Sequence, residues 1–253
     1  MDQSAESVLP AYPEQWQALG WQPTPEQQQQ LNGLYRLIVL GNQQLNLTRI
    51  TDPQEFWEKH LWDSLRGIEP AGLRATARHL PLFQPQLRLI DIGTGAGFPG
   101  VPIAIARPQW QVTLLDSTRK KITFLTQTTS ALNLHNTLGY VDRVEQMGHD
   151  ANHRQQYDVA TIRAVAGATV CAEYALPLVK VGGIVILYRG QWMAEEAIAL
   201  EEAVWQLGGE ILLTDRFTTP LSQGIRTCLY LRKLAPTPER FPRAIGIPTQ
   251  KPL

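Results

Sequence analysis

Two carboxylates and a glycine-rich loop carry the clearest chemical information in the sequence. Residues 87–100 read LRLIDIGTGAGFPG, an apolar segment that ends at Asp91 and continues directly into the glycines. Glycine has no Cβ and readily takes positive φ, so the chain can turn sharply there and approach a ligand closely. A second apolar segment, QVTLLD, ends at Asp116, at the separation along the chain where a carboxylate meets ribose hydroxyls. We therefore expect one nucleoside to contact both carboxylates.

Two classes of ligand fit this loop. Gly95, Gly97 and Gly100 form the G-x-G-x-x-G pattern of dinucleotide sites. The stretch from Asp91 through Gly93 to Gly97 also matches the D-x-G-x-G-x-G loop that is typical of S-adenosylmethionine (SAM) methyltransferases. A carboxylate beside the loop repels a pyrophosphate but suits a ligand that carries an ammonium and a sulfonium. Asp91 therefore favours SAM over NAD, and the second carboxylate argues against a simple turn without a ligand.

The remaining apolar runs predict the sheet that positions this loop. Most runs are separated by helix-length segments such as 117–133 and 194–207, which indicates an α/β doubly wound, Rossmann-like sheet. The seven predicted strands span residues 87–92, 111–116, 137–142, 157–162, 183–188, 209–214 and 226–232. The last connection is a short loop, so we expect the final two strands to be antiparallel. A seven-stranded sheet with such an ending favours a SAM-dependent methyltransferase over the six-stranded NAD fold.

The chain divides into three predicted parts. Residues 1–85 form a helical N-terminal extension with amphipathic helices over 25–45 and 56–65, and residues 86–234 form the SAM-binding domain. Residues 235–253 form a basic C-terminal tail. Residues 232–253, which include this tail, contain one acidic residue, Glu239. The same residues contain five cations, so the segment is a candidate anion contact. The cations are Arg232, Lys233, Arg240, Arg243 and Lys251.

Composition sets broader limits on function. The chain has 253 residues, 43% hydrophobic content and a formal net charge of +0, so its overall charge does not indicate a nucleic-acid binder. Cys171 and Cys228 lack metal-ligand spacing and suit a reducing compartment. The sequence shows neither a signal peptide nor a long apolar run. We expect a soluble cytoplasmic protein with no bound metal and no membrane contact.

The residues after the fourth strand indicate the acceptor. They read Thr161-Ile162-Arg163-Ala164-Val165-Ala166, without the Asn/Asp-Pro-Pro-aromatic turn that amine methyltransferases use. Neither cysteine lies at such a loop, so a cysteine nucleophile for cytosine C5 is absent as well. An acceptor with an available lone pair, such as an aromatic ring nitrogen, needs no base and depends mainly on alignment. Arg163 is the candidate residue for positioning that acceptor.

An ordered set of motifs resembles the glucose-inhibited division protein B family, the bacterial guanine-N7 methyltransferases of small-subunit (16S) ribosomal RNA. The resemblance covers roughly residues 30–253 and depends on NLTR at 46–49, HLWDS at 60–64, the loop at 91–100, LLDS at 114–117 followed by Lys120-Lys121, RVE at 143–145, RA at 163–164, and the terminal segments FPR at 241–243, GIP at 246–248 and PL at 252–253. It implies a SAM-dependent enzyme whose partner is ribosomal RNA, within the small subunit or its assembly intermediate. It also implies a monomer.

The resemblance also implies site residues. It places SAM against Gly93 and Phe98, and it places the ribose and the adenine edge near Asp116, Ser117 and Thr118. Val144 and Glu145 would frame the adenine, and Arg163 would lie at the boundary between cofactor and acceptor. Arg189-Gly190 stands where many members have Lys-Gly, which leaves the role of Arg189 open. A SAM enzyme acting on tRNA or a small molecule is an alternative, and outside this class an NAD-binding oxidoreductase or a nucleotide-sensing module.

Overall fold

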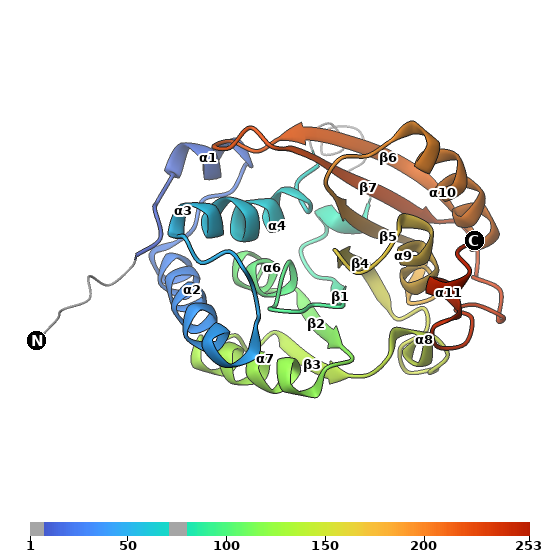
Figure 1. The fold of residues 1–253 in the computed structure, drawn as a ribbon, viewed down its shortest axis with the longest axis horizontal. Coiled ribbons are helices and arrows are strands. Elements are labelled where there is room, and N and C mark those ends of the chain that lie inside the picture. The colour runs from blue at the N-terminus through green and yellow to red at the C-terminus, as the bar shows by residue number, and fades with distance from the viewer. Residues whose placement is uncertain (1–7, 71–79) are drawn as a thin grey trace, which may run out of the picture.

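A seven-stranded sheet between two helical layers forms the body of the protein (Figure 1). The computed structural model describes residues 8–70 and 80–253; residues 1–7 and 71–79 of the expected N-terminal extension lie outside the described residues. The order is β3-β2-β1-β4-β5-β7-β6; β7 pairs antiparallel with β5 and β6, and the other pairs are parallel. The strands are β1 Arg88–Ile92, β2 Gln111–Asp116, β3 Thr137–Val141, β4 Tyr157–Arg163, β5 Val179–Arg189, β6 Gly209–Thr218 and β7 Ile225–Lys233.

The central strands are apolar on both faces because helices cover both faces. Successive residues of β1 alternate between two cores, with Leu89 in one and Ile90 in the other. Strand β5 alternates in the same way, with Ile186 in the first core and Leu187 in the second. Such continuous apolar runs are typical of parallel sheets that are buried on both sides. The sequence prediction of a doubly wound α/β sheet is confirmed.

The first helical layer contains most of the N-terminal extension. It consists of α1 Pro13–Ala18, α2 Pro25–Leu45, α3 Pro53–Phe56, the π-helix η1 Trp57–Trp62, α4 Asp63–Arg66, α6 Gly100–Ala106 and α7 Arg119–Ala131. Helix α2 begins at a capping box in which Thr24 and Gln27 exchange hydrogen bonds, and its buried residues recur at helical spacing. The predicted helix over 56–65 corresponds to three consecutive helical segments, α3, η1 and α4, and the middle one is a wider π-helix.

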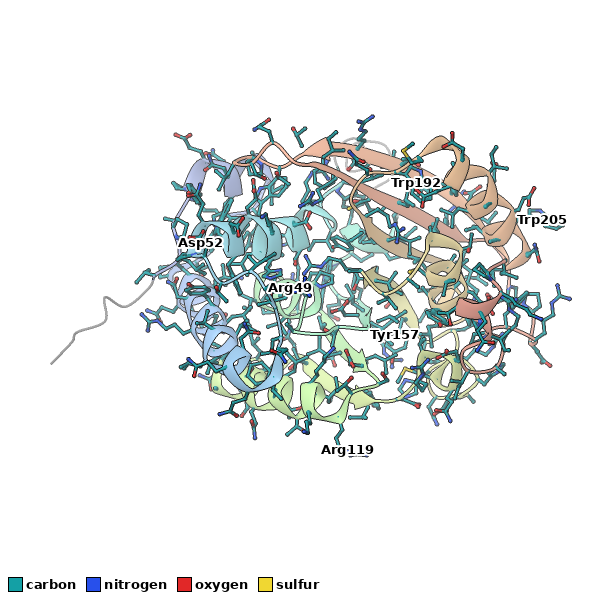
Figure 2. The ribbon with its side chains drawn as sticks, viewed as in Figure 1. Arg49, Asp52, Arg119, Tyr157, Trp192 and Trp205 are labelled. Atoms are coloured by element: carbon teal, nitrogen blue, oxygen red, sulfur yellow. The ribbon has the colours of Figure 1, made fainter. Side chains whose placement is uncertain are left out.

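The second layer covers the opposite face. It contains α8 Val144–Met147, α9 Ala168–Ala175, α10 Ala194–Gln206 and α11 Ile247–Gln250, while the 3₁₀ helix η2 Pro81–Phe83 precedes β1. Figure 2 shows Trp205 of α10 and Arg119 of α7 extending outward from the two helical layers. Across 8–70 and 80–253, the structure contains no helix with the length and apolar character needed to cross a membrane.

The strands differ from their predicted bounds mainly near the antiparallel end of the sheet. Strand β5 starts at Val179 rather than at 183, because the pairing with β4 continues through an irregular register at Tyr157 and Val159. Strand β6 extends to Thr218 rather than ending at 214, because it pairs with β7 along its full length. The predicted antiparallel pairing of the last two strands is confirmed.

The sheet reverses its direction of winding between β1 and β4. Strand β1 leads outward to β2 and β3 on one side, and β4 leads to β5 on the other. Loops from adjacent strands diverge at such a point, which leaves a crevice at the carboxyl ends of the strands. The glycine loop after β1 and the segment after β4 both start at this crevice.

Candidate functional site

Asp91 is the internal support of the glycine loop. Its side chain is completely buried; Oδ2 accepts hydrogen bonds from Thr94 Oγ1 at 2.6 Å and from the backbone N–H of Gly100 at 2.9 Å. Oδ1 accepts from Thr161 Oγ1 at 3.0 Å, which links the loop to β4. Burial raises the pKa of Asp91 to about 6, and the hydrogen bonds act against that rise. This carboxylate therefore holds together the end of β1, the start of α6 and β4.

Gly93 is required by a close approach between the two strand ends. It has φ +65°, and a Cβ there would lie 2.6 Å from Cγ2 of Val165, in the segment after β4. Any other residue would be strained in this conformation and would push the two segments apart. Glycine at this position thus lets the loops meet over the carboxyl end of the sheet.

A first cavity of about 260 Å³ opens at this meeting point. It is formed by the ends of β1, β2, β3 and β4, together with residues from α9 and α11. The lining residues are Ile92, Gly93, Leu115, Asp116, Ser117, Asp142, Arg143, Val144, Glu145, Val165, Ala166, Tyr174 and Thr249. We call it the first cavity below.

Asp116 lies on the wall of the first cavity and is held by backbone groups. Its Oδ1 accepts from the N–H of Thr118 at 2.8 Å, and Oδ2 accepts from the N–H of Gly95 at 3.1 Å. The Nζ of Lys121 is 3.7 Å from Oδ2. A carboxylate has about four lone-pair positions, so Asp116 retains acceptor capacity toward the cavity.

Glu145 lies in the same cavity and has one unused acceptor. Its Oε1 accepts from Arg143 Nη2 at 3.1 Å, from Tyr174 Oη at 3.2 Å and from the N–H of Gly246 at 3.1 Å. Burial would raise the pKa of Glu145, but the hydrogen bonds and the guanidinium of Arg143 hold it below its ordinary value. Oε2 is buried and has no hydrogen-bond partner among the residues that the structure describes. An orphaned buried acceptor is expensive, so it indicates a donor on a ligand.

A second cavity of about 310 Å³ adjoins the first. Its lining residues are Asp63, Arg163, Ala164, Tyr188, Arg189, Gly190, Gln191 and Arg226. The end of β4 separates the two cavities, because Arg163 and Ala164 line the second while Val165 and Ala166 line the first. Ala164 has φ +55°, in the left-handed region, where the chain turns between the two cavities. Such strain in a residue with a Cβ is typical of functional sites.

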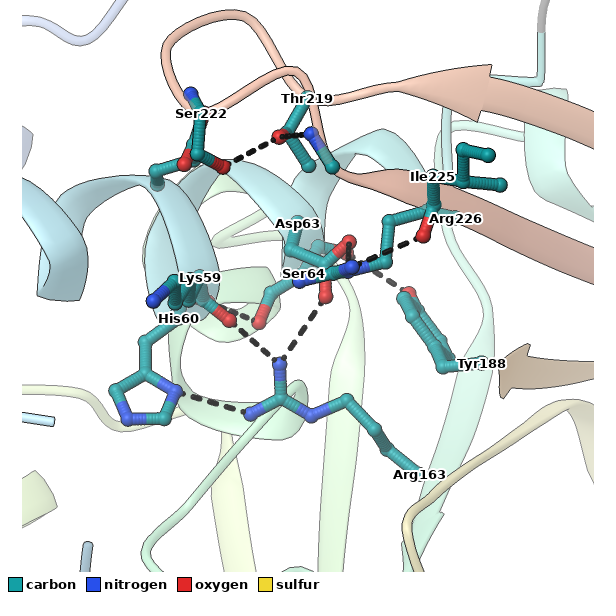
Figure 3. Close-up of polar contacts among 12 residues, drawn as sticks. Lys59, His60, Asp63, Ser64, Arg163, Tyr188, Thr219, Ser222, Ile225 and Arg226 are labelled. Carbon is teal, nitrogen blue, oxygen red and sulfur yellow. Dashed lines mark hydrogen bonds and ion pairs between the residues drawn. The ribbon is translucent and has the colours of Figure 1, made fainter. Parts of the chain in front are cut away.

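The side chain of Arg163 is held by contacts with the π-helix η1 and with α4 (Figure 3). Its Nη1 donates to the carbonyl of Lys59 at 3.0 Å and lies 3.5 Å from Oδ2 of Asp63. Its Nη2 lies 3.3 Å from Nδ1 of His60. One guanidinium thus meets three groups from a single helical stretch. π turns are frequent at functional sites, and this one presents Lys59 and His60 to the same side chain.

His60 supports Arg163 as a neutral base. Burial and the nearby guanidinium of Arg163 lower the pKa of His60 to about 3. Because Nδ1 accepts from Arg163, the proton resides on Nε2, which donates to Thr48 Oγ1 at 2.8 Å. The ring stacks on Phe98 with centroids 4.3 Å apart. The Ser64 hydroxyl donates to the backbone carbonyl of His60 and does not engage the ring.

Comparison with known proteins identifies the family. A family model described as rRNA small subunit methyltransferase G matches residues 27–222. The protein named ribosomal RNA small subunit methyltransferase G from Trichormus variabilis is 57% identical over 249 residues, which cover 98% of this chain and 99% of the relative. The protein of the same name from Nostoc punctiforme is 58% identical, with 98% and 99% coverage.

The chain belongs to the rRNA small subunit methyltransferase G family. A solved structure of the 16S rRNA (adenine(1408)-N(1))-methyltransferase from Catenulisporales acidiphilia, in a variant form, matches the fold with a TM-score of 0.51 and 16% identity. It covers 60% of this chain and 87% of that chain. The resemblance drawn from the ordered motifs is confirmed, and with it the expectation of a SAM-dependent methyltransferase.

The residues predicted for the cofactor divide into two groups in this family member. Gly93, Asp116, Ser117, Val144 and Glu145 line the first cavity. The others lie around it without lining it, and their contact with the cofactor stays a prediction: Asp91, Gly95, Gly97, Phe98, Thr118 and Arg163. Phe98 packs under His60, and Arg163 lines the second cavity instead.

The C-terminal tail is a packed part of the site. Nε of Arg243 donates at 2.9 Å and its Nη2 at 2.6 Å to the carboxylate of Glu173, which is completely buried. Arg154 donates to the carbonyls of Gly148, Phe241 and Thr237 at 2.7–2.8 Å. These contacts place α11 so that Thr249 reaches the first cavity. Sequence reasoning missed Thr249 and Tyr174, since neither belongs to a strand-end motif.

This packing limits which cations of the C-terminal segment are available for the predicted anion contact. Arg243 is paired with Glu173, and Arg232 is paired with Glu210 at 2.5 Å. Lys233 is completely buried, and its Nζ donates to the carbonyls of Leu176 and Val179. Arg243 and Lys233 are thus engaged by buried groups, whereas the pair of Arg232 with Glu210 is half-exposed. Arg240 and Lys251 are exposed, and anion contact stays a prediction for them.

Proposed function

We propose that this protein transfers a methyl group from SAM to N7 of a guanine in small-subunit (16S) ribosomal RNA. The observation that carries the proposal is the pair of adjoining cavities on either side of the β4 end. One cavity offers carboxylates to a nucleoside cofactor, and the other offers arginines to an RNA base. We also propose that it acts in the cytoplasm as a monomer, on rRNA in the small subunit or its assembly intermediate.

The first cavity has groups that suit SAM. The unpartnered Oε2 of Glu145 would accept from the exocyclic amine of the adenine, and Val144 would contact the ring. Asp116 would accept from the ribose hydroxyls, and Ser117 lies beside it. When bound, SAM supplies an electrophilic methyl group on a sulfonium, and its sulfur keeps the electron pair of the broken C–S bond. The residues of the chain bind and orient the two reactants.

The loop geometry argues against a dinucleotide in the same place. A pyrophosphate at the start of α6 would need the free N–H groups of that helix end. The N–H of Gly100, the first residue of α6, already donates to the buried carboxylate of Asp91. A dianionic group there would approach this carboxylate without a compensating donor. We therefore disfavour the NAD-binding alternative.

The second cavity suits an acceptor that needs no deprotonation. His60 is neutral, and its Nδ1 is occupied by Arg163, so it is not free to take a proton from the acceptor. Cys171 is buried and its pKa is raised to about 11 by that burial, which excludes it as a ready nucleophile at neutral pH. Guanine N7 has a lone pair in the plane of the ring and meets this requirement. Proximity and alignment then carry the rate.

The test is transfer of radiolabelled methyl from SAM to RNA, followed by nucleoside analysis. We expect 7-methylguanosine from small subunits or their rRNA, with little label in large-subunit rRNA or tRNA. Label found only in tRNA or only in small molecules would overturn rRNA as the proposed substrate. Calorimetric titration with NAD is the parallel control, and tighter binding of NAD than of SAM would overturn the methyltransferase proposal.

A further inference from the structure

Asp63 is a buried carboxylate in the wall of the second cavity, and its acceptors are not fully used. It is the first residue of α4, directly after the π turn, and it is 7% exposed. Its oxygens lie 3.5 Å from Nη1 of Arg163 and 3.9 Å from Nε of Arg226. Both separations exceed the roughly 2.7–3.2 Å of a good hydrogen bond. The two arginines therefore balance its charge without saturating its lone pairs.

The arginines have other hydrogen-bond partners that hold them in place. Arg163 donates to Lys59 and His60, and Nη1 of Arg226 donates to the carbonyl of Ile225 at 2.9 Å. Burial raises the pKa of Asp63, and the two guanidinium groups oppose that rise. Figure 3 shows the carboxylate between the two guanidinium groups, which come from β4 and β7. The cavity thus presents a charged acceptor beside cationic donors.

Guanine has a complementary pattern of polar groups. Its O6 accepts, and the neighbouring N1–H and exocyclic amine donate, whereas adenine has a donor at C6 and an acceptor at N1. In the proposed reaction N7 must face the methyl group in the first cavity. The N1–H and amine edge is on the opposite side of the purine, so it would face the second cavity, where Asp63 lies.

We propose that Asp63 accepts hydrogen bonds from N1–H and the exocyclic amine of the acceptor guanine and so selects guanine over other purines. This inference depends on the proposed function, because it concerns the same reaction. Arg163 then lies toward O6, between Asp63 and the first cavity. The arrangement explains why a carboxylate is buried in a site that binds a polyanion: its partner is the base and not the phosphate.

The test compares guanosine with inosine at the methylated position. Inosine lacks only the exocyclic amine, so N7 remains available. The methylated guanine is first mapped, and RNA carrying either base there is then assembled by ligation. We expect kcat/KM of the unaltered protein to be about 10- to 100-fold higher for guanosine, as expected for a hydrogen bond to a charged group. In Asp63→Asn the ratio should fall below about fivefold, because a neutral acceptor replaces the charged one.

Asp215→Asn is the matched control. Asp215 is also a largely buried carboxylate paired with an arginine, Arg66 at 2.8 Å, but it lies on β6 and does not line the second cavity. This variant should keep the guanosine-to-inosine ratio of the unaltered protein even if its stability falls. Equal rates on both bases in the unaltered protein would overturn the role of Asp63 while leaving the proposed function intact. A ratio unchanged in Asp63→Asn would overturn it too. Absence of transfer to either RNA would instead contradict the proposed function.

Discussion

The two cavities hold their charged groups by different means. In the first, Asp116 is held by backbone N–H groups of adjacent loops, and one of the three hydrogen bonds to Glu145 also comes from a backbone N–H. In the second, Arg163 and Asp63 are held largely by side chains and by a helical stretch that is distant in sequence. Backbone-held groups recur wherever a loop has the same shape, whereas side-chain networks are specific to one set of neighbours. We therefore expect the proposed cofactor cavity to recur in other proteins of this fold, and the proposed acceptor cavity to depend on the neighbours found in this protein.

The largest effect should come from separating the tail from the first cavity. Arg243→Ala would leave the buried carboxylate of Glu173 without its guanidinium partner. We expect the free energy of unfolding to fall by about 3–5 kcal/mol, the usual cost of an uncompensated buried charge. Arg240→Ala removes an exposed cation from the same tail and should change stability by less than about 0.5 kcal/mol. Denaturant unfolding measures both, and equal effects would show that the pairing of Arg243 with Glu173 does not stabilise the packed tail.

A smaller effect should be confined to cofactor binding. Asp116→Ala should weaken SAM binding by about 1.5–3 kcal/mol, as expected for hydrogen bonds to a charged group. Calorimetry measures this loss, with Asp150→Ala as the control, because Asp150 is an exposed residue outside both cavities. The selectivity of Asp116→Ala between guanosine and inosine should be unchanged. A loss of this selectivity would contradict the proposal that the first cavity binds the cofactor and the second cavity selects the base.

The acceptor side should show its own dependence on pH. Burial holds the folded-state pKa of His60 near 3, below its ordinary value of 6.5, so the unfolded chain takes up the proton first. The stability contributed by the neutral ring is complete above pH 6.5 and is lost as pH falls toward 3. Between pH 7.5 and pH 5, the stability advantage of the unaltered protein over His60→Gln should shrink by about 2 kcal/mol.

Asp91 acts in the opposite sense in part of this range. Its folded-state pKa is raised to about 6, so its protonated form favours the folded state as pH falls from 6 toward its ordinary value. This contribution is present in both proteins and cancels in the difference. Denaturant unfolding at several pH values gives the difference directly. A difference that does not change with pH would show that His60 is accessible to water and does not support Arg163.

The smallest effect concerns RNA affinity. Arg240 and Lys251 are the exposed cations of the tail, and each phosphate contact that is removed should lower the magnitude of the slope of log affinity against log salt by roughly 0.7–0.9. Arg240→Ala and Lys251→Ala should therefore weaken RNA binding in this way and leave SAM affinity unchanged. Filter binding at several salt concentrations measures the slope. An unchanged slope in both variants would show that RNA binds at another surface, for example at the exposed start of α7 around Arg119.

The sequence predicts the two regions unequally, for physical reasons. Strand β1, its glycine loop and Asp116 follow one another along the chain, so spacing alone placed Gly93 and Asp116 in one crevice. Thr249 could not be predicted from spacing, because contacts between distant segments, such as the pairing of Arg243 with Glu173, bring the tail to the cavity. The charges of the tail were also misleading, since a sequence does not show that Lys233 is buried against two carbonyls. Contacts between segments that are distant in sequence determine both the position of Thr249 and the burial of Lys233.

The most direct test of the account is the Arg163→Lys variant, measured for both SAM affinity and single-turnover methyl transfer. Lysine keeps the charge but lacks the planar fork that meets Lys59, His60 and Asp63 together. If Arg163 serves the acceptor cavity, the SAM affinity should stay within about twofold, while transfer falls by about 100-fold or more through lost alignment. A loss of SAM affinity as large as the loss of rate would place Arg163 in the cofactor site and contradict the two-cavity account.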